Sequence, residues 1–180
     1  KAIKPDIFPL ATQAEFPAWL VEKLQLFMPD TDILDLGLSL QKSAPLDLRV
    51  NTILAKRGEV LETLKQEGID AEAAPYSPCG IRLAGKPAIN RHALFLSGKI
   101  EVQDEGSQLL GYLLAPKRGE MVVDFCAGAG GKSLLLGALM NSKGRIYAFD
   151  VSEKRLNNLK PRFKRSGLSN LHIQRITNEN

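Results

Sequence analysis

A glycine-rich segment lies between two apolar runs and reads Asp124-Phe125-Cys126-Ala127-Gly128-Ala129-Gly130-Gly131-Lys132-Ser133. The apolar run 121–123 precedes it and indicates a buried strand, and the leucine-rich run 134–139 follows it and indicates a helix. Glycines let the backbone turn sharply and approach a bound molecule, while the first N–H groups of the helix face that molecule. The stretch therefore predicts a ligand-binding loop between a strand and a helix.

A second short strand is predicted at 145–149, and it ends at Asp150, 19 residues after Gly131. An acid at about this spacing suits the hydroxyls of a nucleoside ribose. Residues 154–165 indicate a basic helix that is kinked or restarted at Pro161, and 171–176 indicate a third strand. Strand, glycine loop, helix, strand and acid in this order predict the start of an α/β Rossmann-like sheet.

The upstream half has a different pattern. Residues 13–42 predict two helices, the first stopped by Pro29 and the second over 31–42. From residue 46 to residue 51, leucine or valine alternates with a polar residue, which predicts a half-buried strand. A helix over 58–67 follows, and Gly68 is expected to end it. Further strands are predicted at 71–75, 81–83, 93–96 and 100–102.

These elements predict a small α+β module, similar in size and order to ferredoxin-like or RNA-recognition domains. It has no pair of aromatic residues on adjacent strands with which such domains stack bases. A helix over 103–114, begun by Asp104 or Ser107, leads from it to the glycine loop. We therefore predict an N-terminal helical segment at 1–45, an α+β domain at 46–102 and the first part of a Rossmann-like domain at 103–180.

Composition limits the classes of protein to consider. With 180 residues and 44% hydrophobic composition, the chain can bury a substantial core. It has no apolar run near the roughly 18 to 20 residues that span a bilayer and no signal-peptide core, so we expect a soluble cytoplasmic protein without a membrane partner. Its two cysteines, Cys79 and Cys126, lack a paired metal-ligand spacing, so we expect reduced thiols and no metal site.

Basic residues are concentrated at the end of the chain. Residues 140–180 carry nine Lys or Arg against three acids, whereas the rest carries fifteen against seventeen. Such a stripe can neutralise RNA phosphates, but it can equally be the solvated face of a helix, and no aromatic residues mark a stacking surface. The stripe consists of Lys154, Arg155, Lys160, Arg162, Lys164 and Arg165.

Two other ligands are possible for the glycine loop, and the spacing disfavours both. A triphosphate-binding Gly-x-x-x-x-Gly-Lys-Ser loop would need its first glycine at position 126, which is Cys126. A dinucleotide-binding Gly-x-Gly-x-x-Gly loop would need its third glycine at position 133, which is Ser133. S-adenosylmethionine needs an acid for its ribose but no cradle for a pyrophosphate, so it fits the loop with the fewest exceptions.

The full run 124–133 resembles motif I of the Sun/Nop family of RNA (cytosine-5)-methyltransferases, which usually reads Asp-x-Cys-Ala-x-Pro-Gly-Gly-Lys-Thr. Val102-Gln-Asp-Glu-Gly-Ser-Gln-Leu109 resembles the helix upstream of that motif, and Leu48-Arg-Val-Asn-Thr52 resembles the first strand of the family's RNA-recognition-like domain. Ala129 and Ser133 depart from the usual proline and threonine, and we expect cofactor binding to survive both changes.

The resemblance implies S-adenosylmethionine as the cofactor. It implies that Asp150 accepts hydrogen bonds from the ribose hydroxyls and that Lys132 meets the cofactor carboxylate or the target nucleotide, Lys132 being the one catalytic candidate. Asp124 would position the loop or contact the ligand, and Arg155 would orient the segment after Asp150. The loop residues expected to bind the methionine portion are Cys126, Ala127, Gly128, Ala129, Gly130, Gly131 and Lys132.

The family places its two catalytic cysteines in Pro-Cys and Thr-Cys motifs beyond the acid of the second strand. Neither motif follows Asp150, and Cys79, although it follows Pro78, lies in the α+β module, so we expect the nucleophile beyond Asn180, in a longer protein. The resemblance implies methylation of cytosine carbon 5 in small-subunit ribosomal RNA, with transfer RNA second, by a monomer. A non-catalytic RNA-binding module is the alternative from another class.

Overall fold

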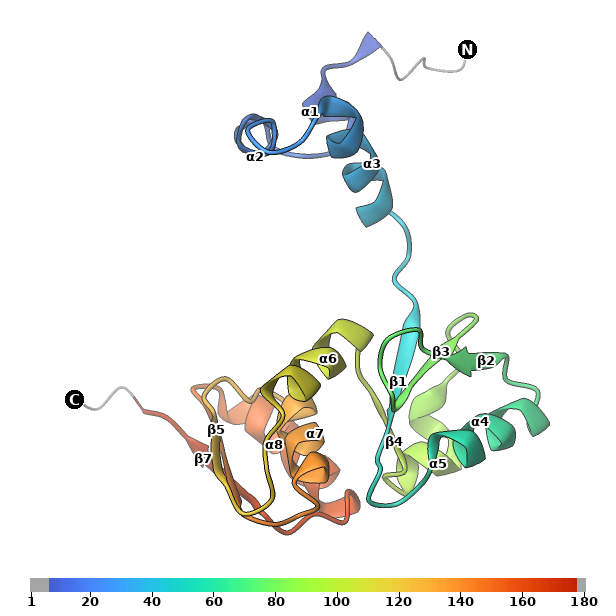
Figure 1. Cartoon of the computed structure of the whole chain (residues 1–180), viewed down its shortest axis with the longest axis vertical. Helices are drawn as coiled ribbons and strands as arrows, with labels where there is room; N and C mark the ends of the chain where they lie inside the picture. Colours follow the sequence, from blue (N-terminus) through green and yellow to red (C-terminus); the bar gives the residue numbers. More distant parts are fainter. Residues whose placement is uncertain (1–6, 178–180) are drawn as a thin grey trace. The chain divides into compact units, whose positions relative to one another are not determined.

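The computed structural model describes residues 7–177, and the chain divides between Ala44 and Pro45 into two units (Figure 1). In the first unit, each helix follows a proline, whose fixed φ suits the residue before a helix. The left-handed φ of Glu15, at 55°, separates the first two helices, so the predicted helix from residue 13 begins only at Ala18. The helices are α1 (Leu10–Gln13), α2 (Ala18–Leu24) and α3 (Asp30–Leu40).

The second unit contains two sheets joined by the helix α6 (Glu105–Leu114). Asp104 begins α6 by accepting a hydrogen bond from the backbone N–H of Ser107, one of the two caps that the sequence predicts. None of the helices within residues 7–177 is both long and apolar enough to span a membrane.

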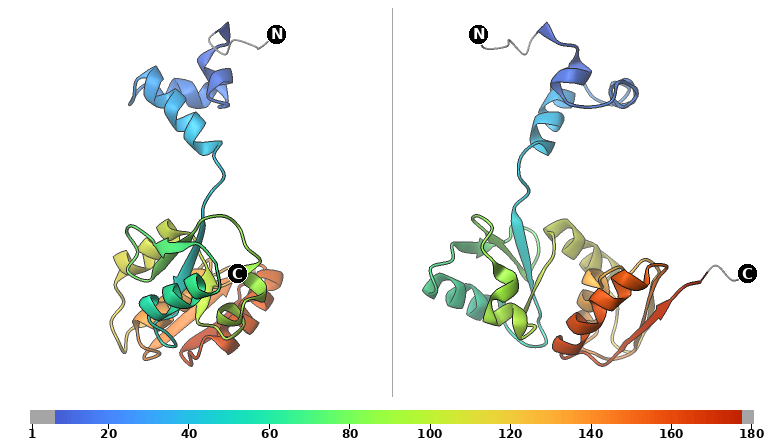
Figure 2. Two further views of the ribbon diagram at one scale, coloured as in Figure 1. Left: turned by 90° about the vertical axis from the view of Figure 1, so that its right-hand side faces the viewer. Right: turned by 180° about the vertical axis from the view of Figure 1, so that it is seen from behind.

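The first sheet is antiparallel, with the strand order β2-β3-β1-β4. The strands are β1 (Leu46–Val50), β2 (Ala71–Ala73), β3 (Gly80–Leu83) and β4 (Ile100–Val102). With α4 (Arg57–Gln66) after β1, the short helix η2 (Ile89–Arg91) and α5 (Ala93–Leu96) before β4, this is the ferredoxin-like order of elements. Figures 1 and 2 show α4 and α5 on the side of this sheet away from the second sheet.

Segment 93–96 is a helix, so the strand predicted there is wrong. The ring nitrogen Nδ1 of His92 accepts a hydrogen bond from the backbone N–H of Leu94 and caps the first turn. The helix α5 then places Leu94 in the apolar core beneath the sheet. Gly68, with φ of 76°, follows α4 in the left-handed conformation that the sequence predicts.

Strand β1 is buried on both faces, against the prediction of a half-buried strand. Its polar residues Asp47 and Arg49 are only 3% and 1% exposed, and Asn51, directly after the strand, is 3% exposed. The Nε of Arg49 donates to Oε1 of Gln103 at 2.6 Å, and the side-chain amide of Asn51 donates to the carbonyl of Ser166 at 2.8 Å. The face that alternation assigned to water is therefore packed against the second domain.

The second sheet is parallel, with the order β5-β6-β7, and consists of β5 (Met121–Asp124), β6 (Arg145–Asp150) and β7 (Leu171–Arg175). The helices α7 (Gly131–Leu139) and α8 (Glu153–Arg165) share one apolar core with these strands. This arrangement is the start of a Rossmann-like fold, as predicted. The helix α8 continues through Pro161, so a restart there, one of the two predicted alternatives, is wrong; buried Leu156 and Leu159 precede the proline and Arg162 is anchored after it.

The prediction of a buried strand at 121–123 is also wrong. Met121 is 65% exposed and Val123 is 55% exposed. β5 is the edge strand of the described sheet, and its alternate residues point away from the core that α7 and α8 share with the sheet. The apolar run thus predicted the strand correctly, but it could not predict which faces of the strand are buried by other elements.

Candidate functional site

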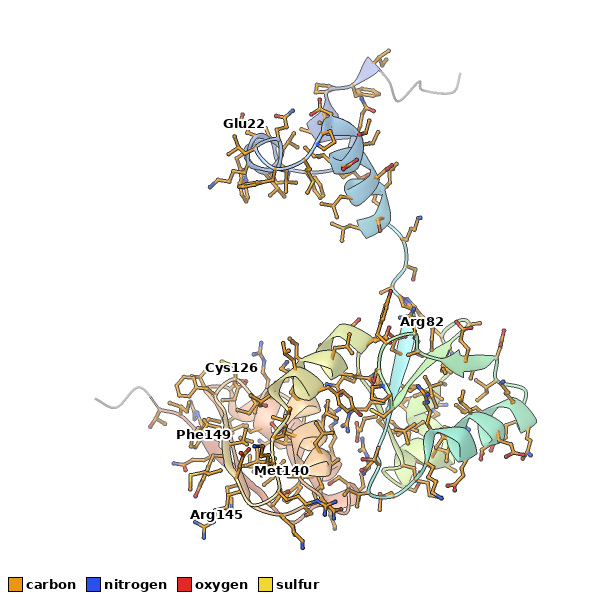
Figure 3. All side chains as sticks on the ribbon, in the orientation of Figure 1. Glu22, Arg82, Cys126, Met140, Arg145 and Phe149 are labelled. Atoms are coloured by element: carbon orange, nitrogen blue, oxygen red, sulfur yellow. The ribbon has the colours of Figure 1, made fainter. Side chains whose placement is uncertain are left out.

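The glycine loop follows the carboxyl end of β5 and leads directly into α7. Gly128 and Gly130 have φ of 56° and 79°, the left-handed region that favours glycine. A Cβ on Gly130 would overlap the side chain of Leu159, so the loop is pressed closely onto α8. Figure 3 shows Cys126 and Arg145 at opposite ends of the parallel sheet: Arg145 lies where β6 begins, and Cys126 lies where β5 ends. Ligands of open α/β sheets bind at this carboxyl end.

Several backbone N–H groups of the loop have no hydrogen-bond acceptor within residues 7–177. The N–H groups of Ala129, Gly131 and Lys132 make no hydrogen bond to another described residue. By contrast, the N–H of Gly130 closes a turn onto the carbonyl of Ala127 at 2.8 Å. Free N–H groups at the start of a helix favour a carboxylate or another acceptor.

Asp150 ends β6 and faces this loop. Its Oδ2 accepts the N–H of Gly128 at 2.8 Å, and its Oδ1 accepts the N–H of Ser152 at 2.8 Å. The hydrogen bond from Ser152 is the main cause that holds the pKa of Asp150 below its ordinary value; burial opposes it, while Gly128 and the charge of Arg155 support it. Each carboxylate oxygen keeps a second acceptor site, so the group can also accept two ligand hydroxyls.

Asp124 and Ser133 join the two ends of the loop. The hydroxyl of Ser133 donates to Oδ2 of Asp124 at 2.6 Å, and Ser133 is fully buried. The sequence left open whether Asp124 positions the loop or contacts a ligand, and this bond gives it a positioning contact. The hydroxyl of Ser133 is thereby used within the protein.

Lys132 is exposed and borders a cavity of about 180 Å³ beside the loop. Apolar side chains of β5, α6 and α7 form much of its wall, among them Val123, Leu110 and Leu136. An amine at this place can reach an anionic group in the cavity. Cys126 is exposed on the loop, whereas Cys79 is buried in the core of the first domain.

The predicted basic stripe separates into two groups. Arg162 and Arg165 are half-buried, and both pair with the carboxylate of Glu101, on β4. Only Lys154, Arg155, Lys160 and Lys164 are exposed. Sequence periodicity could not make this division, because the partner of the two arginines lies about sixty residues upstream.

Sequence reasoning also missed Ser152. It caps α8 through a hydrogen bond from the N–H of Arg155 to its Oγ, while its own N–H contacts Asp150. The run Asp150-Val-Ser-Glu153 carries the signal of a helix start, a serine followed by an acid, and could have revealed it. Within the described part of the chain, no group of three or more His, Cys, Asp or Glu side chains could hold a metal ion.

Comparison with known proteins gives two family matches. Residues 16–90 match the ferredoxin-like domain of RsmF/B-like methyltransferases, and residues 111–179 match the family described as 16S rRNA methyltransferase RsmB/F. The first match includes β1, β2 and β3, and the second includes all three strands of the parallel sheet; β4 and the first part of α6 lie between the two matches. The expected loop residues and Asp150 lie in the second.

Three similar proteins illustrate the likeness. The "Probable ribosomal RNA small subunit methyltransferase B" of Bacillus subtilis is 32% identical over 96% of this chain and 38% of its own length. Ribosomal RNA small subunit methyltransferase B of Photorhabdus laumondii is 35% identical over 83% of this chain and 34% of its own. The structure of a methyltransferase homolog from Pyrococcus horikoshii has 27% identity and a TM-score of 0.85, over 96% of this chain and 56% of its own. The chain spans less than two fifths of both curated relatives.

Proposed function

Because this chain belongs to the RsmB/F family of methyltransferases, we propose that it carries the S-adenosylmethionine site of an enzyme that methylates carbon 5 of cytosine in small-subunit ribosomal RNA. The cofactor supplies an activated methyl group on a sulfonium. The residues of this chain bind and orient that cofactor. The curated relatives are named as methyltransferases of small-subunit ribosomal RNA, which supports the choice of RNA.

One observation carries the proposal: the Asp150 carboxylate and the glycine loop meet at the carboxyl ends of β5 and β6. Gly128 contacts Asp150 at 2.8 Å, and a Cβ on Gly128 would stand only 4.0 Å from the same carboxylate oxygen. The absence of that Cβ leaves room for a ligand beside the acid. A ribose with two adjacent hydroxyls suits Asp150, and the free N–H groups of Gly131 and Lys132 suit the methionine carboxylate.

Methylation of cytosine at carbon 5 requires covalent catalysis, because this carbon is a poor nucleophile. A thiolate would add to carbon 6, carbon 5 would then take the methyl group from the sulfonium of the cofactor, which would leave as a neutral thioether, and a base would remove the carbon 5 proton so that the thiolate is expelled. We assign this thiolate to neither cysteine of the chain. Cys79 is 2% exposed within the apolar core, and Cys126 belongs to the cofactor loop. Lys132 borders the loop cavity, and we assign it to the cofactor carboxylate or the target nucleotide.

The proposal is tested with the full-length protein, labelled S-adenosylmethionine and purified small-subunit ribosomal RNA. We expect label in the RNA, and 5-methylcytidine after digestion to nucleosides and mass spectrometry. Transfer RNA is the comparison substrate, and Asp150→Ala is the variant expected to lose labelling. Label on a nucleoside other than cytidine would overturn the cytosine assignment, and failure of the wild-type protein to bind the cofactor would overturn the site itself.

A non-catalytic RNA-binding role is the second candidate, and the exposed basic residues of α8 favour it. The first sheet does not support base stacking by the mode of RNA-recognition domains, because the face opposite α4 and α5 is covered by the second domain. RNA bound with a salt-dependent affinity, together with no cofactor binding and no methylation, would favour this role.

A further inference from the structure

The guanidinium of Arg162 joins three parts of the second unit. Its Nε and Nη2 lie 2.9 and 2.8 Å from Oε2 of Glu101, and its Nη1 donates to the backbone carbonyl of Ala129 at 2.7 Å. Arg162 is on α8, Glu101 is on β4 of the ferredoxin-like sheet, and Ala129 is in the glycine loop. The donors of a guanidinium are fixed in one plane, so an anchor on one edge determines where the remaining N–H points.

Glu101 is a firm anchor for Arg162. It is only 3% exposed, and its other oxygen, Oε1, accepts Nη2 of Arg165 at 2.7 Å. Arg165 in turn lies over the ring of Phe95, 4.3 Å from its centre. Hydrogen bonds between charged partners in a buried setting are short and strong. The position of the Arg162 side chain is therefore determined by Glu101, on β4 of the first sheet.

The hydrogen bond from Arg162 to Ala129 restrains a segment of the loop whose backbone is otherwise flexible, because a glycine stands on each side of Ala129. Gly128 and Gly130 flank Ala129, and glycine adopts many backbone conformations at little cost. The N–H of Gly128 contacts Asp150, and the N–H of Gly130 contacts Ala127. The bond from Arg162 to the carbonyl of Ala129, together with the turn bond of the Gly130 N–H, fixes the peptide plane that joins Ala129 to Gly130. The free N–H groups of Ala129 and Gly131, on either side of that plane, are then oriented before a ligand arrives.

We propose that Arg162 is a positioning residue through which the ferredoxin-like domain, by way of Glu101, pre-organises the cofactor loop. This inference rests on the proposed function, because the ligand of the loop is taken to be S-adenosylmethionine. A loop held in its binding conformation loses less freedom on binding, so the affinity depends on the brace although Arg162 lies behind the loop.

The test compares Arg162→Ala with Arg165→Ala in the full-length protein. Both variants remove an arginine that pairs with Glu101, but only Arg162 contacts the loop. Calorimetric titration with S-adenosylmethionine, at a temperature where both variants are folded, is expected to show affinity weakened about tenfold or more for Arg162→Ala. For Arg165→Ala we expect a clearly smaller loss than for Arg162→Ala, because Glu101 then keeps its contacts with Arg162, even if the melting temperature falls as far.

Two further variants keep the test decisive if Arg162→Ala does not fold. Arg162→Lys keeps the charge but cannot contact Glu101 and Ala129 together in the same geometry, so we expect an intermediate affinity. Glu101→Gln leaves Arg162 in place with a weaker anchor and is also expected to weaken binding. Wild-type affinity in both Arg162→Lys and Glu101→Gln, or in Arg162→Ala where that variant folds, would overturn the positioning role and leave the proposed function standing. A wild-type protein that does not bind the cofactor would overturn the proposed function, and this inference with it.

Discussion

Oδ2 of Asp150 lies 2.8 Å from the backbone nitrogen of Gly128, so the acid that ends β6 is hydrogen-bonded to the loop that follows β5. Because these two elements are 22 residues apart in the chain, only the parallel pairing of β5 with β6 brings them together.

Replacing Asp150 is expected to weaken cofactor binding. Asp150→Asn removes the negative charge and half of the acceptors, so the affinity for S-adenosylmethionine should fall by about tenfold or more in calorimetric titration. Glu153→Gln is the matched control, because Glu153 is a nearby acid whose side chain is 67% exposed. Equal affinities for wild type and Asp150→Asn would contradict the ribose assignment.

The pH dependence of binding follows from the lowered pKa of Asp150, which the hydrogen bond from Ser152 mainly causes. The carboxylate stays charged well below neutral pH, so we expect no loss of cofactor affinity through Asp150 between about pH 8 and about pH 5. Its contribution to folding is present above the ordinary carboxyl pKa and is lost as the pH falls through the lowered value. A nuclear magnetic resonance titration of this carboxyl that gave a raised pKa would contradict both statements.

Two glycine variants separate backbone strain from packing. Gly128→Ala must hold a left-handed φ but meets nothing closer than 4.0 Å, so we expect a loss of about 1–2 kcal/mol in the free energy of unfolding. Gly130→Ala bears a similar strain and also overlaps Leu159, so we expect about 3 kcal/mol or more. Urea denaturation measures both. A Gly130→Ala protein as stable as Gly128→Ala would show that α8 does not press on the loop.

The hydroxyl of Ser133 is expected to matter for stability. Ser133→Ala leaves the Asp124 carboxylate without this partner, and the free energy of unfolding should fall by about 1–3 kcal/mol. Ser39→Ala, at an exposed position on α3, is the control and should change it by less than about 0.5 kcal/mol. Chemical denaturation of both variants gives the comparison, and equal effects would remove Asp124 from its positioning role.

RNA binding by α8 is tested on its exposed lysines. Lys154→Glu combined with Lys164→Glu should weaken RNA binding and make it less dependent on salt, by about two phosphate contacts at most. Lys65→Glu, at an exposed position on α4, is the control. Gel-shift titrations at several salt concentrations measure the slope. An unchanged slope for the double variant would identify these lysines as a solvated helix face.

The domain limits predicted at 45/46 and 102/103 and the individual roles of residues 126–132 and Asp150 stay predictions. Residues on the two sides of the predicted 102/103 boundary are buried against each other, so a domain boundary in the sequence need not separate two independently folding units. Asn51 and Glu101 belong to the predicted first domain by sequence, yet each is buried against residues of the second.

The sequence by itself determined the glycine loop, the strands on either side of it and the acid that faces it, because turn glycines and apolar periodicity are local signals. It also determined most elements of the ferredoxin-like domain. Local signals could not decide which faces are buried, since burial depends on partners from distant segments. Tertiary structure alone decided that β1 is covered on both faces and that Met121 and Val123 are open. The structure also shows that Arg162, which the sequence gives only as one charge of a basic stripe, links Glu101 to the glycine loop.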